Sequence, residues 1–330
     1  MTIFGDYAQE WLYGAGGYYR NAPAIGMRGD FYTAVTISPF FGGAIANEIA
    51  RRVESGDLAE NAAIVEFGAH NARLIADIIQ FIFTIKKELA FSLNFCVVEP
   101  IAKLREIQKS YLDQSFGEAI KILIADDLKN VKNKNVFAIA NELFDAFAFD
   151  LINGEKIAFV EDHKIVWKEA RNFEILEIAK TLGVDRGEIF RGFFDFAKNL
   201  RDNFENVKFL TFDYGELSPR NDFSARIFTQ NATIPLFEIE NLRNYYQKCD
   251  LTADIPFFYL RNCFEKAGFA KIKITRQNSA LINMGLTELL DIYQTKRGFE
   301  AYQKELGRVN VLLNPAQMGE KFKCFYAETV

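Results

Sequence analysis

The sequence has few of the residues that build metal centres and disulfide frameworks. Its 330 residues include two histidines and four cysteines, and the cysteines form no C-x-x-C pair: Cys96, Cys249, Cys263 and Cys324. Because zinc sites and disulfide scaffolds depend on clustered ligands, neither is indicated. We therefore expect a site that works without a metal.

Long apolar runs are also missing from the sequence. No segment approaches the roughly 20 consecutive apolar residues of a membrane-spanning helix. The first residues, MTIFGDYAQEW, lack the basic segment and apolar core of a signal peptide. The formal net charge is 39 − 44 = −5, whereas general nucleic-acid binders are basic. We expect a cytoplasmic protein with no membrane insertion and no nucleic-acid partner.

The composition is that of a globular protein, with 49% hydrophobic and 25% charged residues. A chain of this length exceeds the usual size of one core, so we expect one large domain with insertions or two domains. Phenylalanine is unusually common, with 33 residues. We interpret most of these rings as core filling in place of leucine rather than as stacking platforms for ligands.

The stretch 62–79, AAIVEFGAHNARLIADII, has the pattern of a strand, a turn and a helix. The apolar run 63–65 is typical of a buried strand, and the apolar residues from Leu74 onward recur at helical spacing. Gly68 stands between them. A strand, a glycine turn and a helix make the first half of a nucleotide-binding βαβ unit, although such loops usually contain two or three glycines.

Further short apolar runs at 95–98, 122–125, 136–142 and 207–213 are separated by helical stretches. This alternation predicts an α/β fold with a mostly parallel, doubly wound sheet. Late strands are expected at 271–275 and 322–327, with helices near 286–296 and 298–307. Residues 153–203 interrupt this alternation of strands and helices, and they suggest a hairpin followed by two polar helices. Residues 1–30 suggest loops, and 216–255 suggest an irregular or partly helical insertion.

Each predicted strand of the doubly wound sheet ends close to an acidic residue, and ligands of such sheets bind beyond the carboxyl ends of the strands. Glu99 is placed to hydrogen-bond a ribose hydroxyl pair, or is a solvated loop acid. Asp126 is placed to accept from an adenine amino group, or caps an exposed helix. The acids of this group are Glu66, Glu99, Asp126, Glu142 and Asp213.

Glu142 and Asp145 are three residues apart, so they share a face if a helical turn begins there. A pair of carboxylates suits a guanidinium, which presents its donors in a planar fork. The alternative is an acidic surface patch. His70 has no evident partner for base catalysis, and we interpret it as a loop histidine.

Several motifs, taken in order, resemble those of the MidA-like methyltransferases, a family that includes the mitochondrial complex I assembly methyltransferase. The first is Gly29-Asp30-Phe31-Tyr32-Thr33 with Ile37-Ser38 and Phe41-Gly42, similar to the family's GDF-x-T-x-x-x-I-S-x-x-FG opening. The likeness continues to about Phe325 in five further segments: 140–146 (ANELFDA), 213–215 (DYG), 251–255 (LTADI), 283–285 (NMG) and 314–319 (NPAQMG).

The resemblance implies a Rossmann-like class I methyltransferase that uses S-adenosylmethionine and carries inserted cap segments. It implies a cofactor-capping extension at 1–60, a core at 61–150 and 205–330, and insertions at 151–204 and 216–265. By the same likeness, Asp30 closes over the methionine end of the cofactor. The implied cofactor contacts are Gly29, Asp30, Thr33, Glu66, Gly68, Glu99 and Asp126, and the residues facing the transferring methyl are Asn141, Glu142 and Asp145.

The family's mitochondrial member methylates an arginine of a respiratory-complex subunit, so the likeness implies a protein substrate, such as a respiratory-complex subunit, and an arginine acceptor. Two glycines of the family's E-L-G-P-G-x-G loop are His70 and Ala72 here, and Val35-Thr36 replaces the usual Pro-Glu. Because glycine admits positive φ and close backbone approach, we expect cofactor binding to be weakened or lost. A non-catalytic binding or assembly module is the alternative function, and a small-molecule methyltransferase is a more distant one.

Overall fold

The computed structural model describes residues 1–21, 33–169, 173–229 and 232–329. The chain divides into two compact units, which are described separately. Unit 1 comprises Met1–Phe31, Leu143–Lys198 and Tyr214–Ala267. Unit 2 comprises Tyr32–Glu142, Asn199–Asp213 and Gly268–Val330.

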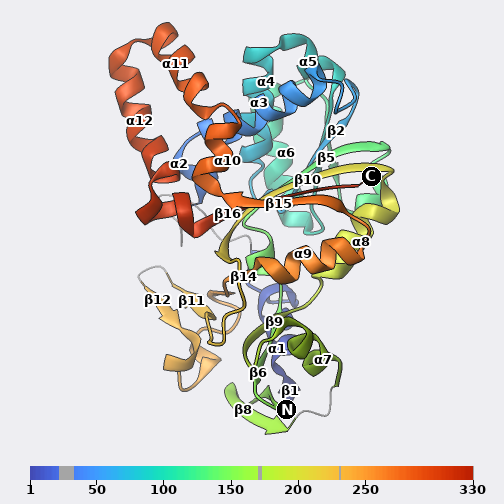
Figure 1. The fold of residues 1–330 in the computed structure, drawn as a ribbon, viewed down its shortest axis with the longest axis vertical. Coiled ribbons are helices and arrows are strands. Elements are labelled where there is room, and N and C mark those ends of the chain that lie inside the picture. Colours follow the sequence, from blue (N-terminus) through green and yellow to red (C-terminus); the bar gives the residue numbers. More distant parts are fainter. Residues whose placement is uncertain (22–32, 170–172, 230–231, 330) are drawn as a thin grey trace. The chain divides into compact units, whose positions relative to one another are not determined.

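Unit 2 is built on a mostly parallel sheet, as the sequence predicted (Figure 1). The strands from β10 to β4 pair in parallel, whereas β15 and β16 pair with each other antiparallel. The spatial order is β15 (Ala270–Arg276), β16 (Phe322–Glu328), β10 (Asn206–Glu216), β5 (Asn135–Asn141), β2 (Ala63–Phe67), β3 (Asn94–Val98) and β4 (Ile122–Ala125). The α/β, Rossmann-like fold class is therefore confirmed.

The direction in which successive strands are added reverses at β2. The chain passes from β2 to β3 and β4 on one side, and then returns to add β5 on the other side of β2. In doubly wound sheets, ligands bind beyond the carboxyl ends of the strands at such a reversal. The topology alone therefore directs attention to the residues that follow β2 and β5.

Helices cover this sheet, and α4 shows why they form. Its buried residues Leu74, Ile75, Ile78, Ile79 and Ile82 recur at helical spacing and enter the main core of unit 2. Figure 1 shows α3, α4 and α10 on one side of the sheet. The helices of unit 2 are α2 (Ala34–Ile37), α3 (Phe40–Glu54), α4 (Arg73–Ile85), α5 (Lys87–Ser92), α6 (Ala102–Phe116), α10 (Gln277–Asn283), α11 (Leu286–Arg297) and α12 (Phe299–Leu313).

Unit 1 contains two antiparallel sheets. The first has the order β1 (Thr2–Ile3), β7 (Lys156–Glu161), β6 (Phe149–Asn153) and β9 (Arg186–Phe190), with β8 (Lys164–Glu169) paired to β7. The β7–β8 pair confirms the predicted hairpin. The second has the order β12 (Thr233–Pro235), β11 (Arg226–Phe228) and β13 (Asp250–Thr252). The remaining helices are α1 (Phe4–Tyr13), α7 (Phe173–Leu182), α8 (Phe193–Asn203) and α9 (Phe257–Lys266).

One expectation was wrong and another was incomplete. Residues 1–30 were expected to form loops, but α1 occupies Phe4–Tyr13 and buries Phe4, Ala8, Trp11 and Leu12. Its apolar residues have helical spacing, which the glycines that follow it obscured. Residues 216–255 were expected to be irregular or partly helical, and this is confirmed in part. They contain the short 3-10 helices Leu236–Glu238 and Leu242–Asn244, but they also supply the three strands of the second sheet. Strand β9, between α7 and α8, was not predicted at all.

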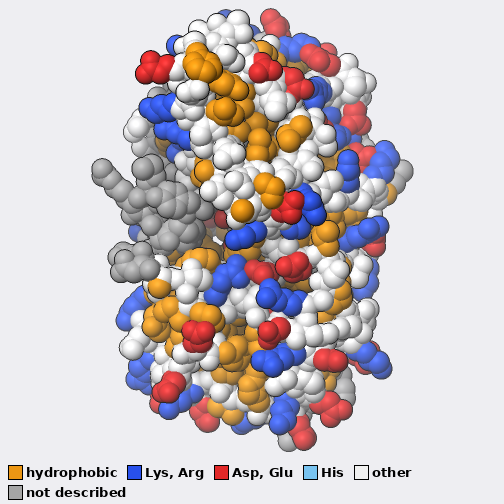
Figure 2. All heavy atoms as spheres, turned by 60° about the vertical axis from the view of Figure 1, so that its left-hand side comes forward, with side chains coloured by type: hydrophobic (Ala, Val, Ile, Leu, Met, Phe, Trp, Pro, Cys, Tyr) orange, Lys and Arg blue, Asp and Glu red, His pale blue; other side chains and the backbone are white. Residues whose placement is uncertain are grey.

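Charges on the molecule are mixed. On the face drawn in Figure 2, basic and acidic side chains of the described residues are interspersed rather than gathered by sign. Across the ranges that the structure describes, no helix combines the length and apolarity needed to cross a bilayer.

Candidate functional site

The strand ends of unit 2 bring the predicted polar residues to one edge of the sheet. Phe67 lies opposite both Val98 and Ala140 in the parallel pairing, and Val98 lies opposite Ala125. The residues that follow these positions therefore form a row along the carboxyl edge: Gly68, Glu99, Asp126, Asn141 and Glu142.

The loop between β2 and α4 has a backbone that glycine would favour, although only one of its residues is glycine. The φ angles of Gly68, His70 and Ala72 are 66°, 44° and 63°. The Ala72 side chain is fully buried in the core of unit 2, whereas His70 is partly exposed. The loop thus keeps its left-handed turns despite the two substitutions, and of the two replacing side chains only His70 reaches the surface.

Glu66 fastens this loop from within the sheet. It is the fourth residue of β2, is 3% exposed, and its Oε2 accepts a hydrogen bond of 2.9 Å from the amide of Ile75 in the first turn of α4. Burial raises the pKa of Glu66 to about 8, against the lowering effect of that hydrogen bond. Glu66 therefore supports the helix that begins at the loop.

Glu99 is a buried acid and not a solvated loop residue, since it is 4% exposed. Its Oε1 accepts from the Ile101 amide at 2.9 Å, and its Oε2 accepts from Gln108 Nε2 at 3.4 Å. Burial raises the pKa of Glu99, while these donors and Arg105 oppose the rise. The same Gln108 nitrogen donates to the carbonyl of His70 at 3.1 Å. Gln108 thereby links the end of β3 to the turn after β2.

For the other predicted cofactor residues, the structure shows only local hydrogen bonds or gives no description. Asp126 is exposed and accepts from Asn130 at 2.7 Å, while its neighbour Asp127 caps the short turn Leu128–Asn130. Thr33 precedes α2, where its amide donates to Thr36 Oγ1 at 3.1 Å. Gly29 and Asp30 lie outside the described residues. The cofactor roles of Asp126, Thr33, Gly29 and Asp30, like those of Glu66, Gly68 and Glu99, stay predictions.

Asn141 and Glu142 stand at the end of β5, next to the reversal of the sheet. Asn141 Nδ2 donates to Glu142 Oε1 at 3.0 Å. The Glu142 amide continues the ladder by donating to the Phe212 carbonyl at 2.8 Å, although Glu142 has a φ of 51°. The buried Oδ1 of Asn141 has no hydrogen-bond partner among the residues that the structure describes. This strand end therefore offers oxygen acceptors to a ligand that donates.

Asp145 belongs to unit 1, because the boundary between the units falls between Glu142 and Leu143. It lies in a short 3-10 turn, Phe144–Ala146, and is 8% exposed. The Tyr214 hydroxyl donates to Asp145 Oδ2 at 2.7 Å, and the Thr252 hydroxyl lies 2.6 Å from that of Tyr214. Burial raises the pKa of Asp145, while Tyr214, the charge of Arg226 and Thr252 act against the rise.

Sequence reasoning gave no role to Gln108, Tyr214 or Thr252. Gln108 carried a signal, since it stands between Leu104 and Leu112 on the buried stripe of α6, where a polar residue needs partners. Tyr214 and Thr252 lie within the motifs that resemble the family. Packing explains why the residue next to Tyr214, Gly215, is a glycine. A Cβ on Gly215 would lie 2.1 Å from the carbonyl oxygen of Ile255, its parallel neighbour in β14 (Ile255–Pro256).

Comparison with known families and proteins identifies the kind of protein. A family model described as "Putative S-adenosyl-L-methionine-dependent methyltransferase" matches residues 44–275. The chain is 25% identical over 353 residues to the mitochondrial protein arginine methyltransferase NDUFAF7 of Rattus norvegicus, covering 94% of this chain and 77% of that protein. The human protein of that name is 25% identical over 356 residues, covering 94% and 76%.

Two solved structures from Burkholderia thailandensis, both of the COG1565 superfamily, share the fold. One is bound to S-adenosyl-homocysteine and has a TM-score of 0.81 at 21% identity, covering 98% of this chain and 87% of that one. The other, a native structure, has a TM-score of 0.77 at 20% identity, covering 98% and 86%. The resemblance read from the motifs is thus confirmed. The relatives are named as mitochondrial, and the cytoplasmic location expected from the sequence stays a prediction.

Proposed function

The chain belongs to the family of S-adenosyl-L-methionine-dependent methyltransferases, and on that premise we propose that it methylates a protein nitrogen, the guanidinium of an arginine. The observation that carries the proposal is the acceptor-rich end of β5, where Asn141 holds Glu142 at the reversal of the sheet. The arginine methyltransferase names of the rat and human relatives support it.

The edge of the sheet fits a nucleoside cofactor. Gly68, His70 and Ala72 keep the left-handed turns of a glycine loop, and Glu99 follows the strand whose terminal acid binds ribose hydroxyls in dinucleotide-binding folds. When bound, S-adenosylmethionine supplies a methyl group already activated by its sulfonium charge. We propose that Gly68 and Glu99 bind the cofactor, and that the neighbouring strand end at Glu142 receives the acceptor.

An arginine acceptor matches the oxygens available at this strand end. A guanidinium has five N–H donors and no acceptor, and Asn141 Oδ1 and the Glu142 carboxylate are acceptors. Lysine must lose its proton before it attacks a methyl group, and a neighbouring carboxylate opposes that loss by raising the lysine pKa. A carboxylate favours guanidinium binding. As the new C–N bond forms and the methyl–sulfur bond breaks, the attacking guanidinium nitrogen gives up one proton, which the Glu142 carboxylate accepts, and the methylated product keeps a single positive charge.

Asp145 is the second carboxylate of the proposal. Its role follows from the resemblance to the family, in which the segment 140–146 carries Asn141, Glu142 and Asp145. The Tyr214 hydroxyl donates to the Oδ2 atom of Asp145, and this hydrogen bond fixes the orientation of the carboxylate. We propose that Glu142 and Asp145 both orient the acceptor, with Tyr214 as a positioning residue for Asp145.

The test is incorporation of a labelled methyl group from S-adenosylmethionine into a proteome extract, followed by mapping of the modified residue. We expect label on arginine. Glu142→Gln and Asp145→Asn should each reduce transfer by roughly 10²-fold, the scale of losing one electrostatic contact in a transition state. Affinity for S-adenosylhomocysteine should change little. Glu155→Gln, an exposed acid in the turn after β6, is the matched control and should transfer normally.

Label on lysine, or full transfer by the Glu142→Gln variant, would contradict the arginine proposal. If the chain incorporates no label and binds no cofactor, the assembly-module alternative is favoured instead. The substitutions at His70 and Ala72 are the observation that keeps this alternative in view.

A further inference from the structure

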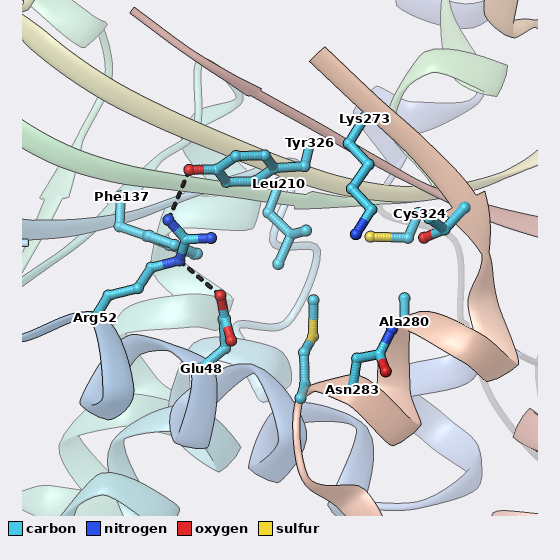
Figure 3. A pocket seen from close by; sticks show the side chains of 11 residues that line it. Glu48, Arg52, Phe137, Leu210, Lys273, Ala280, Asn283, Cys324 and Tyr326 are labelled. Atoms are coloured by element: carbon cyan, nitrogen blue, oxygen red, sulfur yellow. Dashed lines mark hydrogen bonds and ion pairs between the residues drawn. The ribbon is translucent and has the colours of Figure 1, made fainter. Parts of the chain in front are cut away.

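Unit 2 contains a pocket on a part of the sheet away from the cofactor edge (Figure 3). The pocket has a volume of about 120 Å³ and lies between α3, α10 and the strands β5, β10, β15 and β16. Phe137, the third residue of β5, lines it, whereas the cofactor edge begins after the carboxyl end of that strand. The two places are therefore distinct.

One face of the β15–β16 ladder supplies polar and apolar groups to the same pocket. Lys273 pairs with Tyr326, and Thr275 pairs with Cys324, so these alternate residues point to one side of the sheet. The helices α3 and α10 lie over this side. The apolar lining consists of Phe137, Leu210, Ala280, Met284 and Cys324, all of which are buried.

On one wall, the charged groups are already compensated. Arg52 pairs with Glu48 at 2.6 Å and donates to the Tyr326 hydroxyl at 2.8 Å, as Figure 3 shows. The pairs continue beyond the pocket in a chain with equal numbers of cations and carboxylates: Arg52, Lys208 and Lys271 with Glu48, Asp57 and Glu328. This wall therefore adds no net charge.

Lys273 is the cation left over. Its amine forms no hydrogen bond or ion pair with any described residue. In Figure 3 the Lys273 side chain descends from β15 and directs its amine into the pocket beside the Cys324 sulfur. Burial raises the pKa of the Cys324 thiol to about 12, so this sulfur is a neutral, apolar contact. The Lys273 ammonium group, which has no paired carboxylate, thus lies at the entrance of a pocket lined mainly by apolar side chains.

We propose that this pocket binds a small organic monocarboxylate, with the carboxylate on Lys273 and a short apolar chain against Met284, Leu210 and Phe137. The net lining charge of +1, from Arg52 and Lys273 against Glu48, favours an anion. The apolar lining favours a ligand with a hydrocarbon body over a bare ion. The proposal does not depend on methyl transfer.

The test uses the full-length protein with its methionine methyl groups labelled with ¹³C. The chain has four methionines, so the spectrum is sparse, and Met284→Leu identifies the signal of the residue that lines the pocket. Hexanoate is titrated at low salt while the methyl signals are followed. Hexanol tests the need for charge, and inorganic phosphate tests the need for an apolar body.

We expect hexanoate to shift the Met284 signal in a saturable way, and hexanol and phosphate to bind more weakly. Lys273→Gln should weaken hexanoate binding by about threefold to tenfold, the range between an exposed ion pair and a sheltered charged hydrogen bond. Lys271→Gln is the matched control, because Lys271 lies on the same strand but pairs with Glu328 and does not line the pocket. Its affinity for hexanoate should match that of the parent.

Three results would overturn the proposal. The first is an unmoved Met284 signal at millimolar hexanoate. The second is equal hexanoate affinity in the parent and the Lys273→Gln protein, with an unchanged melting temperature showing that the variant is folded. The third is phosphate binding as tight as hexanoate binding, which would make the pocket a site for bare anions.

Discussion

The Glu66 carboxylate accepts a hydrogen bond of 2.9 Å from the amide of Ile75, nine residues further along the chain. Ile75 lies in the first turn of α4, where helix amides need an outside acceptor. The residue at the N-cap is Ala72, which has no side-chain oxygen to offer. Glu66, a strand residue, therefore supplies the acceptor that a capping side chain would otherwise give, and it ties the loop between β2 and α4 to the centre of the sheet.

The first prediction concerns the pH dependence of stability. Burial raises the pKa of Glu66 to about 8, whereas an unfolded glutamate titrates near 4.3. Between these two pKa values the folded chain binds more protons than the unfolded chain does. The free energy of unfolding therefore falls as pH rises through this range, by up to about 1.4 kcal/mol per pH unit. Between pH 6 and 8, Asp77, with a pKa raised by burial to about 6, contributes little further slope.

Glu66→Gln keeps an acceptor for the Ile75 amide and removes the titration. Urea unfolding at pH 6, 7 and 8 should show a flatter pH profile for this variant than for the parent. Glu88→Gln, an exposed acid of α5, is the control and should keep the parent slope. Parallel profiles for the parent and the Glu66→Gln protein would show that Glu66 is already ionised at pH 6.

The second prediction separates the two substitutions in the glycine loop. Both His70 and Ala72 have positive φ, but the Ala72 methyl group is buried in the core while the His70 ring is partly exposed. We expect His70→Gly to tighten S-adenosylhomocysteine binding severalfold, because it removes a ring from the turn where the backbone approaches a ligand. Ala72→Gly relieves backbone strain but loses a buried methyl group, so cofactor affinity should not change.

Isothermal titration calorimetry on the parent and the two single variants makes the comparison. Melting temperatures are needed as well, since each added glycine loosens the unfolded chain by up to about 1 kcal/mol. Loss of affinity in the His70→Gly protein would mean that the ring contacts the cofactor.

How far the sequence could predict the structure depended on how local the signal was. The parallel strands were predictable because each is a short apolar run between helices, and β2 is buried at all five positions. Strand β11 was missed because the residues around it in the sequence are polar. It is the middle strand of its sheet, with β12 on one side and β13 on the other. A strand of three residues leaves too short a period to detect.

The same distinction applies to the site. The row of acids at the carboxyl edge was predictable, because parallel strands bring their ends together. The partners that fix these acids were not, since Tyr214 is 69 residues from Asp145 and Thr252 is 107 residues from it. Nor could spacing show that Glu99 is buried, which excludes the solvated-acid interpretation.

The last prediction tests Glu99 as the residue that holds the cofactor ribose. Glu99→Ala should weaken S-adenosylhomocysteine binding by roughly 1.5–3 kcal/mol, the contribution of a charged hydrogen bond. The substitution also removes the acceptor of the Ile101 amide and of Gln108, so some affinity could be lost through the loop rather than through a ribose contact.

Gln108→Leu separates these two causes. It removes the link from Glu99 to the His70 carbonyl and leaves the carboxylate and its Ile101 hydrogen bond in place. If Glu99 binds ribose directly, Glu99→Ala should weaken binding far more than Gln108→Leu does. Calorimetry with adenosine as a second ligand sharpens the test, because the ribose contact should be lost for adenosine as well. Glu106→Ala, an exposed acid on α6, is the control and should bind as the parent does. Equal losses in the Glu99 and Gln108 variants would instead make Glu99 a positioning residue for the loop, acting through Gln108 on the turn at His70.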